Sequence, residues 1–258
     1  MGDWVRVDTI DAVAVVTLNN VETRNALSRG MLEMLSADLV KLNADDHIRA
    51  IVLTGAGDHF CAGGDISGMI TARTVSESRS RIPVTARIAR ELMGGAKPVI
   101  SAVEGWAAGA GLSLVSASDF VVSSSQARYA AAFGKMGLLP DMGLLWSLPQ
   151  RIGLVETKRL LFTGCTIDAN KALALGLADQ LCEPGEAREV AIELACEFTN
   201  CAPLPMAIIK SSYAAGLSTL GDALRCELDN QPGLFQTQDH REAVAAFLDK
   251  RKPVYRNS

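Results

Sequence analysis

The sequence predicts an α/β core followed by a helical C-terminal region. Short apolar runs alternate with helical patterns through the first half of the chain. From about Leu154 onward the pattern is mainly helical, with breaks at residues such as Gly164 and Pro184. Strands that alternate with helices are typical of a sheet with largely parallel pairing. The chain has 258 residues, which is enough for one large domain or two modest ones.

The first predicted elements are a strand over residues 13–18, ended by polar residues, and a helix over about 28–43. Ser28 is the expected N-cap of that helix. Its apolar residues fall on one face at helical spacing, namely Met31, Leu35, Leu39 and Leu42. Further strands are predicted over residues 50–53, 99–103 and 120–123, and a weaker one over 179–183.

Composition excludes several classes of protein. The formal net charge is -4, and no long basic run is present, so nucleic-acid binding is not indicated. No apolar run reaches the roughly 18 residues of a membrane span. The N-terminal residues lack the charged start and apolar stretch of a signal peptide. We therefore expect a soluble, cytoplasmic protein with no membrane partner.

Cysteine and histidine usage indicates neither disulfides nor a metal site. The six cysteines form no C-x-x-C pair, and their irregular spacing suits reduced thiols in a cytosolic protein. The three histidines, His47, His59 and His240, lie far apart in the sequence. We expect no bound metal.

Two loops share one design. Residues 60–66, FCAGGDI, and residues 105–111, GWAAGAG, each follow a strand and are expected to lead into a helix. Small residues at such a turn let a ligand approach the backbone, and the helix start presents unpaired N–H donors. Two such turns side by side could aim two N–H groups at one oxygen, as in an oxyanion hole.

Each loop also has a plainer interpretation, which is tight packing of a helix on a strand. The Gly109-x-Gly111 pair is in addition a fragment of a dinucleotide-binding fingerprint. That fingerprint is incomplete, because Leu114 occupies the position of its third glycine.

Five segments, taken in order, resemble motifs of the enoyl-CoA hydratase/isomerase (crotonase) family. Residues 20–27, ending in RNAL, resemble the segment beside the adenine of coenzyme A. The two glycine-rich loops resemble the halves of the oxyanion hole. Residues 137–143 with 148–151 are similar to the active-site helix segment, and residues 241–253 to the C-terminal helix. The ordered set covers nearly the whole chain.

The resemblance implies roles for particular residues. The backbone N–H groups of Gly64 and Ala110 would form the oxyanion hole, with alanine at 110 where the family usually has glycine. Arg24 would contact a phosphate of coenzyme A. The backbone around Ala26, Ala62 and Ile66 would hold the adenine, and Asp65 would belong to the same binding site. Phe247 and Lys250 would reach the coenzyme A of a neighbouring subunit. Plainer interpretations are a solvated Arg24 and a core Phe247.

The resemblance also implies an architecture. We expect a crotonase-like spiral of ββα units over residues 1–195, which holds the acyl-CoA site, and a helical oligomerisation region over 196–258. The family forms trimers, or hexamers built from two trimers. No separate cofactor is expected, because coenzyme A is part of the thioester substrate.

The family's hydratases resemble one another in using two glutamates, and both are missing from this sequence. The corresponding positions hold Ser113 and Phe133. Serine without a base is a poor proton acceptor near neutral pH, and phenylalanine cannot act as one. An apolar wall such as Phe133 would instead exclude water from the site and raise a neighbouring pKa.

Asp141 is the remaining candidate acid, at the position where family members that move a double bond carry Asp or Glu. Isomerisation needs only one carboxylate, which takes a proton from one carbon and returns it to another. The plainer interpretation is a turn residue after Pro140. Dehalogenases of the family use an Asp here but need a histidine upstream, and no histidine lies between His59 and His240.

The sequence thus predicts a Δ3 to Δ2 enoyl-CoA isomerase. Two alternatives stay open at this point. One is a hydratase that uses another acid, such as Asp65 or Glu104. The other is an acyl-CoA binding protein that has kept the fold without the chemistry.

Overall fold

The computed structural model describes residues 2–66, 74–80 and 82–258, whose strands form two sheets. The larger sheet has six strands in the order β1-β2-β3-β4-β6-β9. The smaller has three, in the order β5-β7-β8. The strands of the larger sheet are β1 (Val5–Ile10), β2 (Val13–Leu18), β3 (Ala50–Gly55), β4 (Val99–Val103), β6 (Phe120–Ser124) and β9 (Gln180–Cys182). Those of the smaller are β5 (Trp106–Ala108), β7 (Arg128–Ala130) and β8 (Thr166–Asp168).

The strands predicted from apolar runs are confirmed, and most pair in parallel. The pairs β2–β3, β3–β4, β4–β6 and β6–β9 are parallel, whereas β1 lies antiparallel to β2 at the sheet edge. Only Val5 of β1 is buried. A strand with so little burial leaves no apolar run in the sequence, which is why no strand was predicted there.

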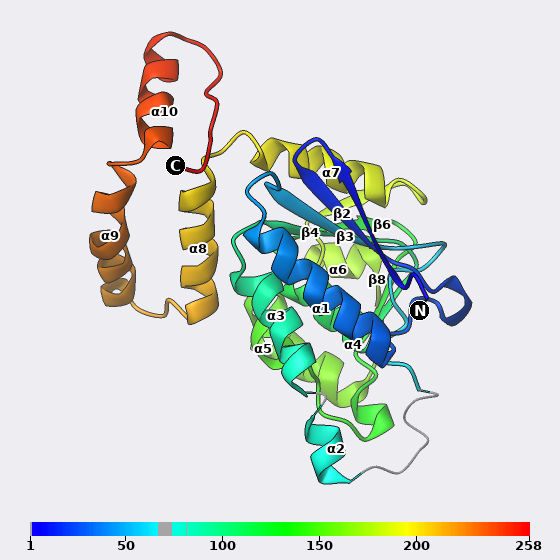
Figure 1. Cartoon of the computed structure of the whole chain (residues 1–258). Coiled ribbons are helices and arrows are strands. Elements are labelled where there is room, and N and C mark those ends of the chain that lie inside the picture. The colour runs from blue at the N-terminus through cyan, green and yellow to red at the C-terminus, as the bar shows by residue number, and fades with distance from the viewer. Residues whose placement is uncertain (1, 67–73, 81) are drawn as a thin grey trace.

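The central strands are buried on both faces, as a parallel sheet between helices requires. Along β2, Val13 and Val15 face α7 (Ala187–Phe198), while Val16 and Leu18 belong to the main core on the opposite side. The main core is covered by α1 (Arg29–Ala44), α3 (Ile82–Gly94) and α4 (Ala110–Ala117). Figure 1 shows α7 on one side of the large sheet and α1 with α3 on the other.

The N-terminus of α1 lies where the sequence predicts it. The Ser28 Oγ accepts a hydrogen bond from the Met31 N–H at 3.3 Å, and Met31, Leu35, Leu39 and Leu42 are buried. The cap satisfies one of the backbone donors that a helix start leaves unpaired.

Successive turns of chain place one strand in each sheet and then a helix. β4 is followed by β5 and α4, and β6 by β7 and α5 (Leu144–Thr163). The next turn contributes β8, α6 (Ala169–Leu175) and β9. This arrangement confirms the predicted spiral of ββα units. The carboxyl ends of β3 and β4 lead into the two glycine-rich loops that carry the candidate site.

The helical second half begins earlier than predicted and is interrupted. α5 starts at Leu144 rather than near Leu154, and it bends at Gly153, whose φ is 74°. The strand β8 then pairs antiparallel with β7. Three residues with a single buried side chain are too short for a periodic signal, so the prediction of a mainly helical region with a break at Gly164 missed this strand.

The C-terminal helices form an arm that leaves the core. α8 (Pro203–Ala215) packs beside α3, and α9 (Leu220–Leu234) and α10 (Gln238–Leu248) lie farther out (Figure 1). The division expected near residue 195 falls within the last turn of α7, which still packs on the sheet.

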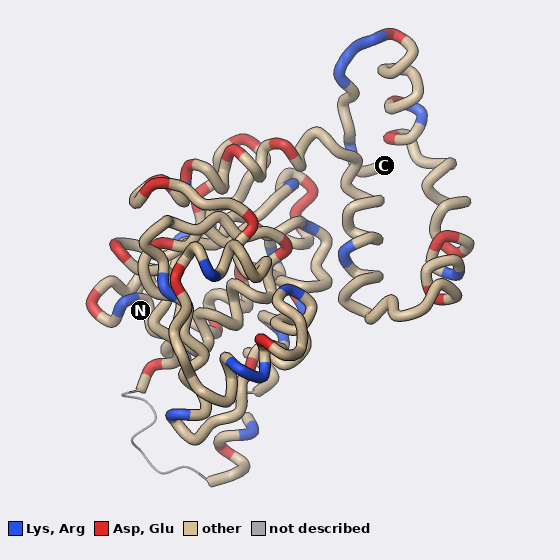
Figure 2. The backbone as a smooth tube through the Cα atoms, turned by 180° about the vertical axis from the view of Figure 1, so that it is seen from behind, with Lys and Arg blue, Asp and Glu red and all other residues tan. Residues whose placement is uncertain are grey.

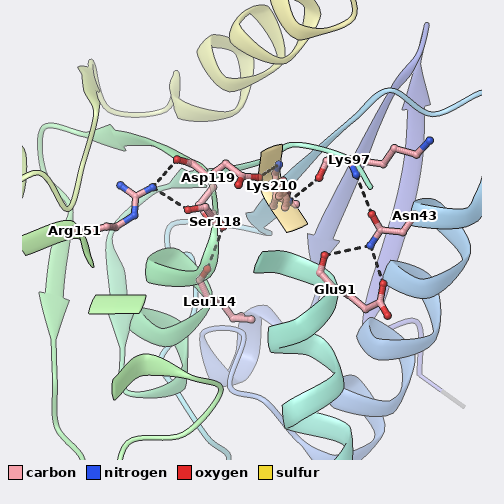
Figure 3. Close-up of polar contacts among 10 residues, drawn as sticks. Asn43, Glu91, Lys97, Leu114, Ser118, Asp119, Arg151 and Lys210 are labelled. Atoms are coloured by element: carbon pink, nitrogen blue, oxygen red, sulfur yellow. Dashed lines mark hydrogen bonds and ion pairs between the residues drawn. The ribbon is translucent and has the colours of Figure 1, made fainter. Parts of the chain in front are cut away.

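One buried ion pair attaches α8 to the core. The Lys210 ammonium lies 2.6 Å from both the Asp119 Oδ2 and the Lys97 carbonyl oxygen. The same Asp119 oxygen accepts the Val99 N–H, at the start of β4. Arg151 donates to the carbonyls of Ser118 and Asp119, each at 2.8 Å. Figure 3 shows this network at the C-terminal end of α4.

Charges are spread along the chain and do not gather in one basic region. Figure 2 shows Lys and Arg interspersed with Asp and Glu, and acidic residues recur along α7. Among the described residues, no single helix has the length and apolar composition of a membrane span. In the described part of the chain, α7 and α8 satisfy both criteria as a pair, but the chain bends by 111° between them.

Removing the Lys210 charge should destabilise the fold. Lys210→Met leaves the Asp119 carboxylate, whose side chain is 26% exposed, without its cation. We expect the free energy of unfolding in urea to fall by about 3 kcal/mol, as for other broken buried pairs. The control is Arg29→Met, which breaks an exposed pair with Glu33 and should cost about 0.5 kcal/mol or less. Equal, small losses in both variants would contradict this role for Lys210.

Candidate active site

The two glycine-rich loops lie side by side and are held together by backbone hydrogen bonds. Cys61 pairs with Ala107 of β5 in a parallel bridge. The Cys61 N–H donates to the Trp106 carbonyl, and the Cys61 carbonyl accepts the Ala108 N–H, both at 2.9 Å. The Gly109 N–H in turn bonds the Ala130 carbonyl of β7 at 2.8 Å. The smaller sheet therefore sets the position of one loop relative to the other.

The close approach of these loops explains why glycine stands at two positions. Gly63 has φ of 105°, and a Cβ there would lie 2.9 Å from the Ala108 carbonyl oxygen. A Cβ on Gly111 would lie 2.5 Å from the Cys61 carbonyl oxygen. Both separations are too short for a side chain, so packing alone requires glycine at these positions. The packing interpretation and the functional one therefore apply together.

Two residues of the loops line a common pocket, and the backbone N–H of each is without a backbone acceptor in the described ranges. Gly64 and Ala110 both line it, and its volume is about 250 Å³. Ala110 is the first residue of α4, so its N–H lacks an acceptor within the helix. Within residues 2–66, 74–80 and 82–258, neither N–H donates to a backbone carbonyl. An oxygen atom of a ligand could accept both.

Asp141 lies in the wall of the same pocket. The chain turns here, because the Leu144 N–H donates to the Asp141 carbonyl at 3.0 Å. The next residue, Met142, is buried and adopts a left-handed conformation with φ of 50°. That conformation is uncommon for a long side chain and costs on the order of 1 kcal/mol. Asp141 is thus a turn residue and a pocket residue at once.

The Asp141 carboxyl is poorly solvated. Its Oδ1 is buried and has no hydrogen-bond partner in the described part of the chain. Burial raises the pKa of Asp141 above its ordinary value, and a hydrogen bond from its own backbone N–H opposes that shift. A buried carboxylate with one oxygen unpartnered holds its negative charge poorly and is therefore a stronger base.

The rest of the pocket is mainly apolar. Its other lining residues come from α1, α2 (Val75–Arg79), α3 and the loops, and are Leu27, Leu32, Asp65, Ser78, Ile82, Thr85, Leu138 and Met142. Carbon chains of a ligand could lie along this surface while the polar atoms meet the loop N–H groups and Asp141.

A third segment, residues 24–27, is joined to the first loop. The Leu27 N–H donates to the Gly63 carbonyl at 2.7 Å, and the Ala62 N–H donates to the Arg24 carbonyl at 2.9 Å. Asn25 fixes this segment with its buried side chain. Its Oδ1 accepts the Asn20 N–H, and its Nδ2 donates to the carbonyls of Ala56 and His59.

The structure gathers most of the predicted site residues at one end of the sheets. Arg24 and Ala26 lie beside the first loop, which carries Ala62, Gly64, Asp65 and Ile66. Arg24, Ala62 and Ile66 are exposed, so a ligand could reach them. Phe247 and Lys250 lie apart on the arm, and Phe247 is 83% exposed rather than packed in a core.

The positions of the missing glutamates hold side chains without acid chemistry. Ser113 is fully buried in α4 and donates to the Gly109 carbonyl at 3.5 Å. Phe133 is buried in the main core and does not line the pocket. Glu104 lies elsewhere, because its Oε1 accepts the N–H groups of Gly185 and Ala187 at the start of α7. Asp65 does line the pocket.

One prediction cannot be placed. The helix expected directly after Ile66 lies outside the described residues. The next described residue, Thr74, is the N-cap of α2. In the described ranges no three His, Cys, Asp or Glu side chains gather closely enough to hold a metal ion.

Comparison with known proteins identifies the family. The enoyl-CoA hydratase/isomerase family matches residues 8–258. A short-chain-enoyl-CoA hydratase of Clostridium acetobutylicum is 34% identical over 242 residues, which are 93% of this chain and 92% of that protein. A 1,2-epoxyphenylacetyl-CoA isomerase of Escherichia coli is 34% identical over 251 residues, which are 94% of each chain.

Solved structures agree with this. An enoyl-CoA hydratase from Polaromonas sp. JS666 superposes with a TM-score of 0.91 at 34% identity, covering 98% of this chain and 99% of that one. An enoyl-CoA hydratase from Bacillus anthracis gives 0.93 at 28% identity, covering 99% and 100%. The chain therefore belongs to the enoyl-CoA hydratase/isomerase family and has the crotonase-like fold. It is an enzyme of that family.

Some pocket residues carry no signal in the sequence. Ile82 and Thr85 come from α3, and their side chains reach the site only because α3 packs against α1 and α4. Local periodicity predicts the buried face of a helix but not the element it meets. Leu138 and Met142 flank Asp141, and that proximity is the one signal that could have found them.

The raised pKa of Asp141 predicts a stability effect. A carboxyl whose folded pKa exceeds its unfolded value stabilises the fold when protonated, and this contribution is lost as pH rises through the folded pKa. At pH 7 the buried carboxylate is therefore destabilising, and Asp141→Asn should raise the melting temperature. Well below the ordinary aspartate pKa of about 4, where the carboxyl is protonated in both the folded and the unfolded chain, the difference should vanish. A variant that melts lower than the parent at pH 7 would contradict this burial argument.

Proposed function

We propose that this enzyme moves a carbon–carbon double bond in an acyl-CoA thioester from the Δ3 to the Δ2 position. The observation that carries the proposal is the placement of Asp141. Its carboxyl, with a buried and unpartnered oxygen, lines the same pocket as Gly64 and Ala110, whose N–H groups donate to no backbone carbonyl in the described ranges. The two positions that would supply a hydratase with acids hold Ser113 and Phe133.

The chemistry uses these three groups together. The thioester oxygen accepts the N–H groups of Gly64 and Ala110. Ionised Asp141 removes a proton from C2 of the 3-enoyl chain, and the electrons move into the thioester to give a dienolate. The same carboxyl returns the proton to C4, which leaves the double bond between C2 and C3. The N–H donors stabilise the negative charge where it develops, and such stabilisation is often the largest contribution to the rate.

Hydration would require more than this pocket offers. Water must be activated at C3 while a proton is delivered at C2, and two acid–base groups share that work in the family's hydratases. Asp65 is the one other carboxyl among the described lining residues. Glu104 is excluded as the second acid because it caps α7. Hydratase activity through Asp65 is the alternative that the experiments must test.

Most of the similar relatives are named for hydration, and the isomerase among them is named for an epoxide substrate. The C. acetobutylicum protein is named for hydration and the E. coli protein for an isomerisation, at equal identity to this chain. Both names include a CoA thioester. This supports an acyl-CoA substrate, with coenzyme A carried by the substrate and no further cofactor.

The residues beside the first loop suit the coenzyme A moiety. We assign the phosphates to Arg24, which is exposed. The adenine would contact backbone near Ala26, Ala62 and Ile66. The Leu27–Gly63 and Ala62–Arg24 hydrogen bonds bring these residues together.

Asp141→Asn tests the catalytic assignment. The change keeps size and removes the base, so it should lower kcat for a 3-enoyl-CoA by about 10²–10⁴. Affinity for the thioester should change little, because the N–H donors and the coenzyme A contacts remain. Absorbance of the conjugated product measures the rate, and calorimetric titration with a saturated acyl-CoA measures affinity. The matched control is Asp8→Asn on the exposed edge strand β1.

Two results would overturn the assignment. Asp141→Asn that isomerises as fast as the parent would show that another group moves the proton. A parent that hydrates a 2-enoyl-CoA readily, loses this with Asp65→Asn and never isomerises a 3-enoyl-CoA would make the enzyme a hydratase. Binding of thioesters without turnover would indicate a non-catalytic acyl-CoA protein.

The arm supports the proposal that the enzyme is a trimer or a hexamer. Leucines recur on one face of α9 and are largely exposed, at 75% for Leu220, 53% for Leu224 and 73% for Leu228. A contiguous apolar surface of this kind usually meets another chain. In such an assembly Phe247 and Lys250 of one copy would reach the coenzyme A of the next.

Light scattering tests the assembly. The parent should have three or six times the chain mass at micromolar concentration. Leu224→Glu combined with Leu228→Glu should shift the mass toward the monomer, because charges would be buried at the interface. The control is Val75→Glu, at an exposed position of α2. A monomeric parent would contradict the proposal.

A further inference from the structure

Cys61 is the residue at which the two donor loops meet. Its backbone pairs with Trp106 and Ala108 on one side. Its side chain is fully buried, and a Cβ on Gly111 would lie only 2.9 Å from the Cys61 Cβ. Gly111 is the second residue of α4 and directly follows Ala110, one of the two proposed oxyanion donors. Cys61 therefore touches the start of the helix that carries that donor.

The Cys61 sulfur also holds the other loop. The Gly63 N–H donates to the Cys61 Sγ at 3.4 Å, across a turn of two residues. Gly63 has a left-handed φ of 105°, which leaves the next peptide free to adopt many orientations. The hydrogen bond to sulfur restricts the Gly63 backbone, and the next N–H along the chain is that of Gly64.

The thiol is suited to accepting a hydrogen bond and not to acting as a nucleophile. Burial raises the pKa of Cys61 to about 12, and the negative charge of Asp141 adds to the shift. The side chain is therefore neutral at working pH, and a neutral thiol is a poor nucleophile.

We propose that Cys61 is a positioning residue that sets the orientation of the Gly64 N–H relative to the Ala110 N–H, through its sulfur contact with Gly63 and its packing against Gly111. The inference rests on the proposed role of these N–H groups as an oxyanion hole. It assigns no chemical step to Cys61. An oxyanion hole loses much of its effect when a donor is slightly misaimed, because the contribution depends on donor geometry.

The test compares three substitutions at one site. Cys61→Ser keeps an acceptor that can make the same two-residue turn. Cys61→Val keeps volume without the acceptor, and Cys61→Ala removes both. The control is Cys182→Ala, which removes a thiol in β9 away from the pocket. Melting curves for all variants check that each one folds.

The decisive readout needs no turnover. A CoA thioester conjugated to an electron-rich aromatic ring absorbs at longer wavelength when its carbonyl oxygen is hydrogen-bonded. We expect the red shift on binding to be kept by Cys61→Ser and Cys182→Ala, and to be mostly lost in Cys61→Val and Cys61→Ala. In the isomerase assay the latter two should lose about tenfold or more in kcat with little change in KM, since loss of a whole donor costs about 10²–10³.

The outcomes separate this inference from the proposed function. Folded Cys61→Val and Cys61→Ala variants with the full red shift and full kcat would overturn it. If Cys61→Val and Cys61→Ala lose the red shift but the parent enzyme does not isomerise a 3-enoyl-CoA, the positioning role is supported and the proposed isomerase function is refuted. Should Cys61→Ala fail to fold, the difference between Cys61→Ser and Cys61→Val decides, and equal red shifts in those two would overturn the inference.

Discussion

Backbone hydrogen bonds between segments far apart in the sequence hold the site together. The Leu27 N–H bonds the Gly63 carbonyl, and Cys61 exchanges bonds with Trp106 and Ala108. These contacts join residues 24–27 and the two glycine-rich loops into one unit, which is attached to the smaller sheet through β5. Each loop alone is a common strand-to-helix connection. The pairing makes it possible for two N–H groups to meet one oxygen.

The same region carries an energetic cost. Asp141 holds a charge with one oxygen unpartnered, and its neighbour Met142 adopts a left-handed conformation. Such features persist only where the surrounding packing determines them, and they concentrate at functional sites. By contrast, the charged groups of the Lys210–Asp119 pair are fully engaged and serve to attach the arm. The unpartnered carboxyl oxygen thus lies in the candidate site, whereas the paired charges lie where α8 is attached to the core.

Sequence reasoning predicted the parts of the fold that leave a local pattern. The central strands are continuous apolar runs, and α1 combines an apolar face with a serine cap, so both were predicted correctly. β1 and β8 were not predicted, because each buries a single side chain and is held in place by pairing with a neighbouring strand. The start of α5 at Leu144 was also missed.

The candidate site divides in the same way. Its loops and Asp141 were found through a resemblance between short motifs, and the structure places Gly64, Ala110 and Asp141 in one pocket. The wall formed by Ile82 and Thr85 depends on how α3 packs, which no local pattern records. The contact between the Cys61 sulfur and Gly63 depends on a turn whose geometry follows from the left-handed glycine.

The central claim is that this pocket moves a proton along a carbon chain and does not add water. The most direct measurement is proton NMR of the parent enzyme incubated with 3-enoyl-CoA thioesters, followed over time. We expect the C3–C4 double-bond signals to be replaced by those of the conjugated 2-enoyl-CoA, with no 3-hydroxyacyl-CoA accumulating. Unchanged 3-enoyl-CoA, together with rapid formation of 3-hydroxyacyl-CoA from an added 2-enoyl-CoA, would contradict it.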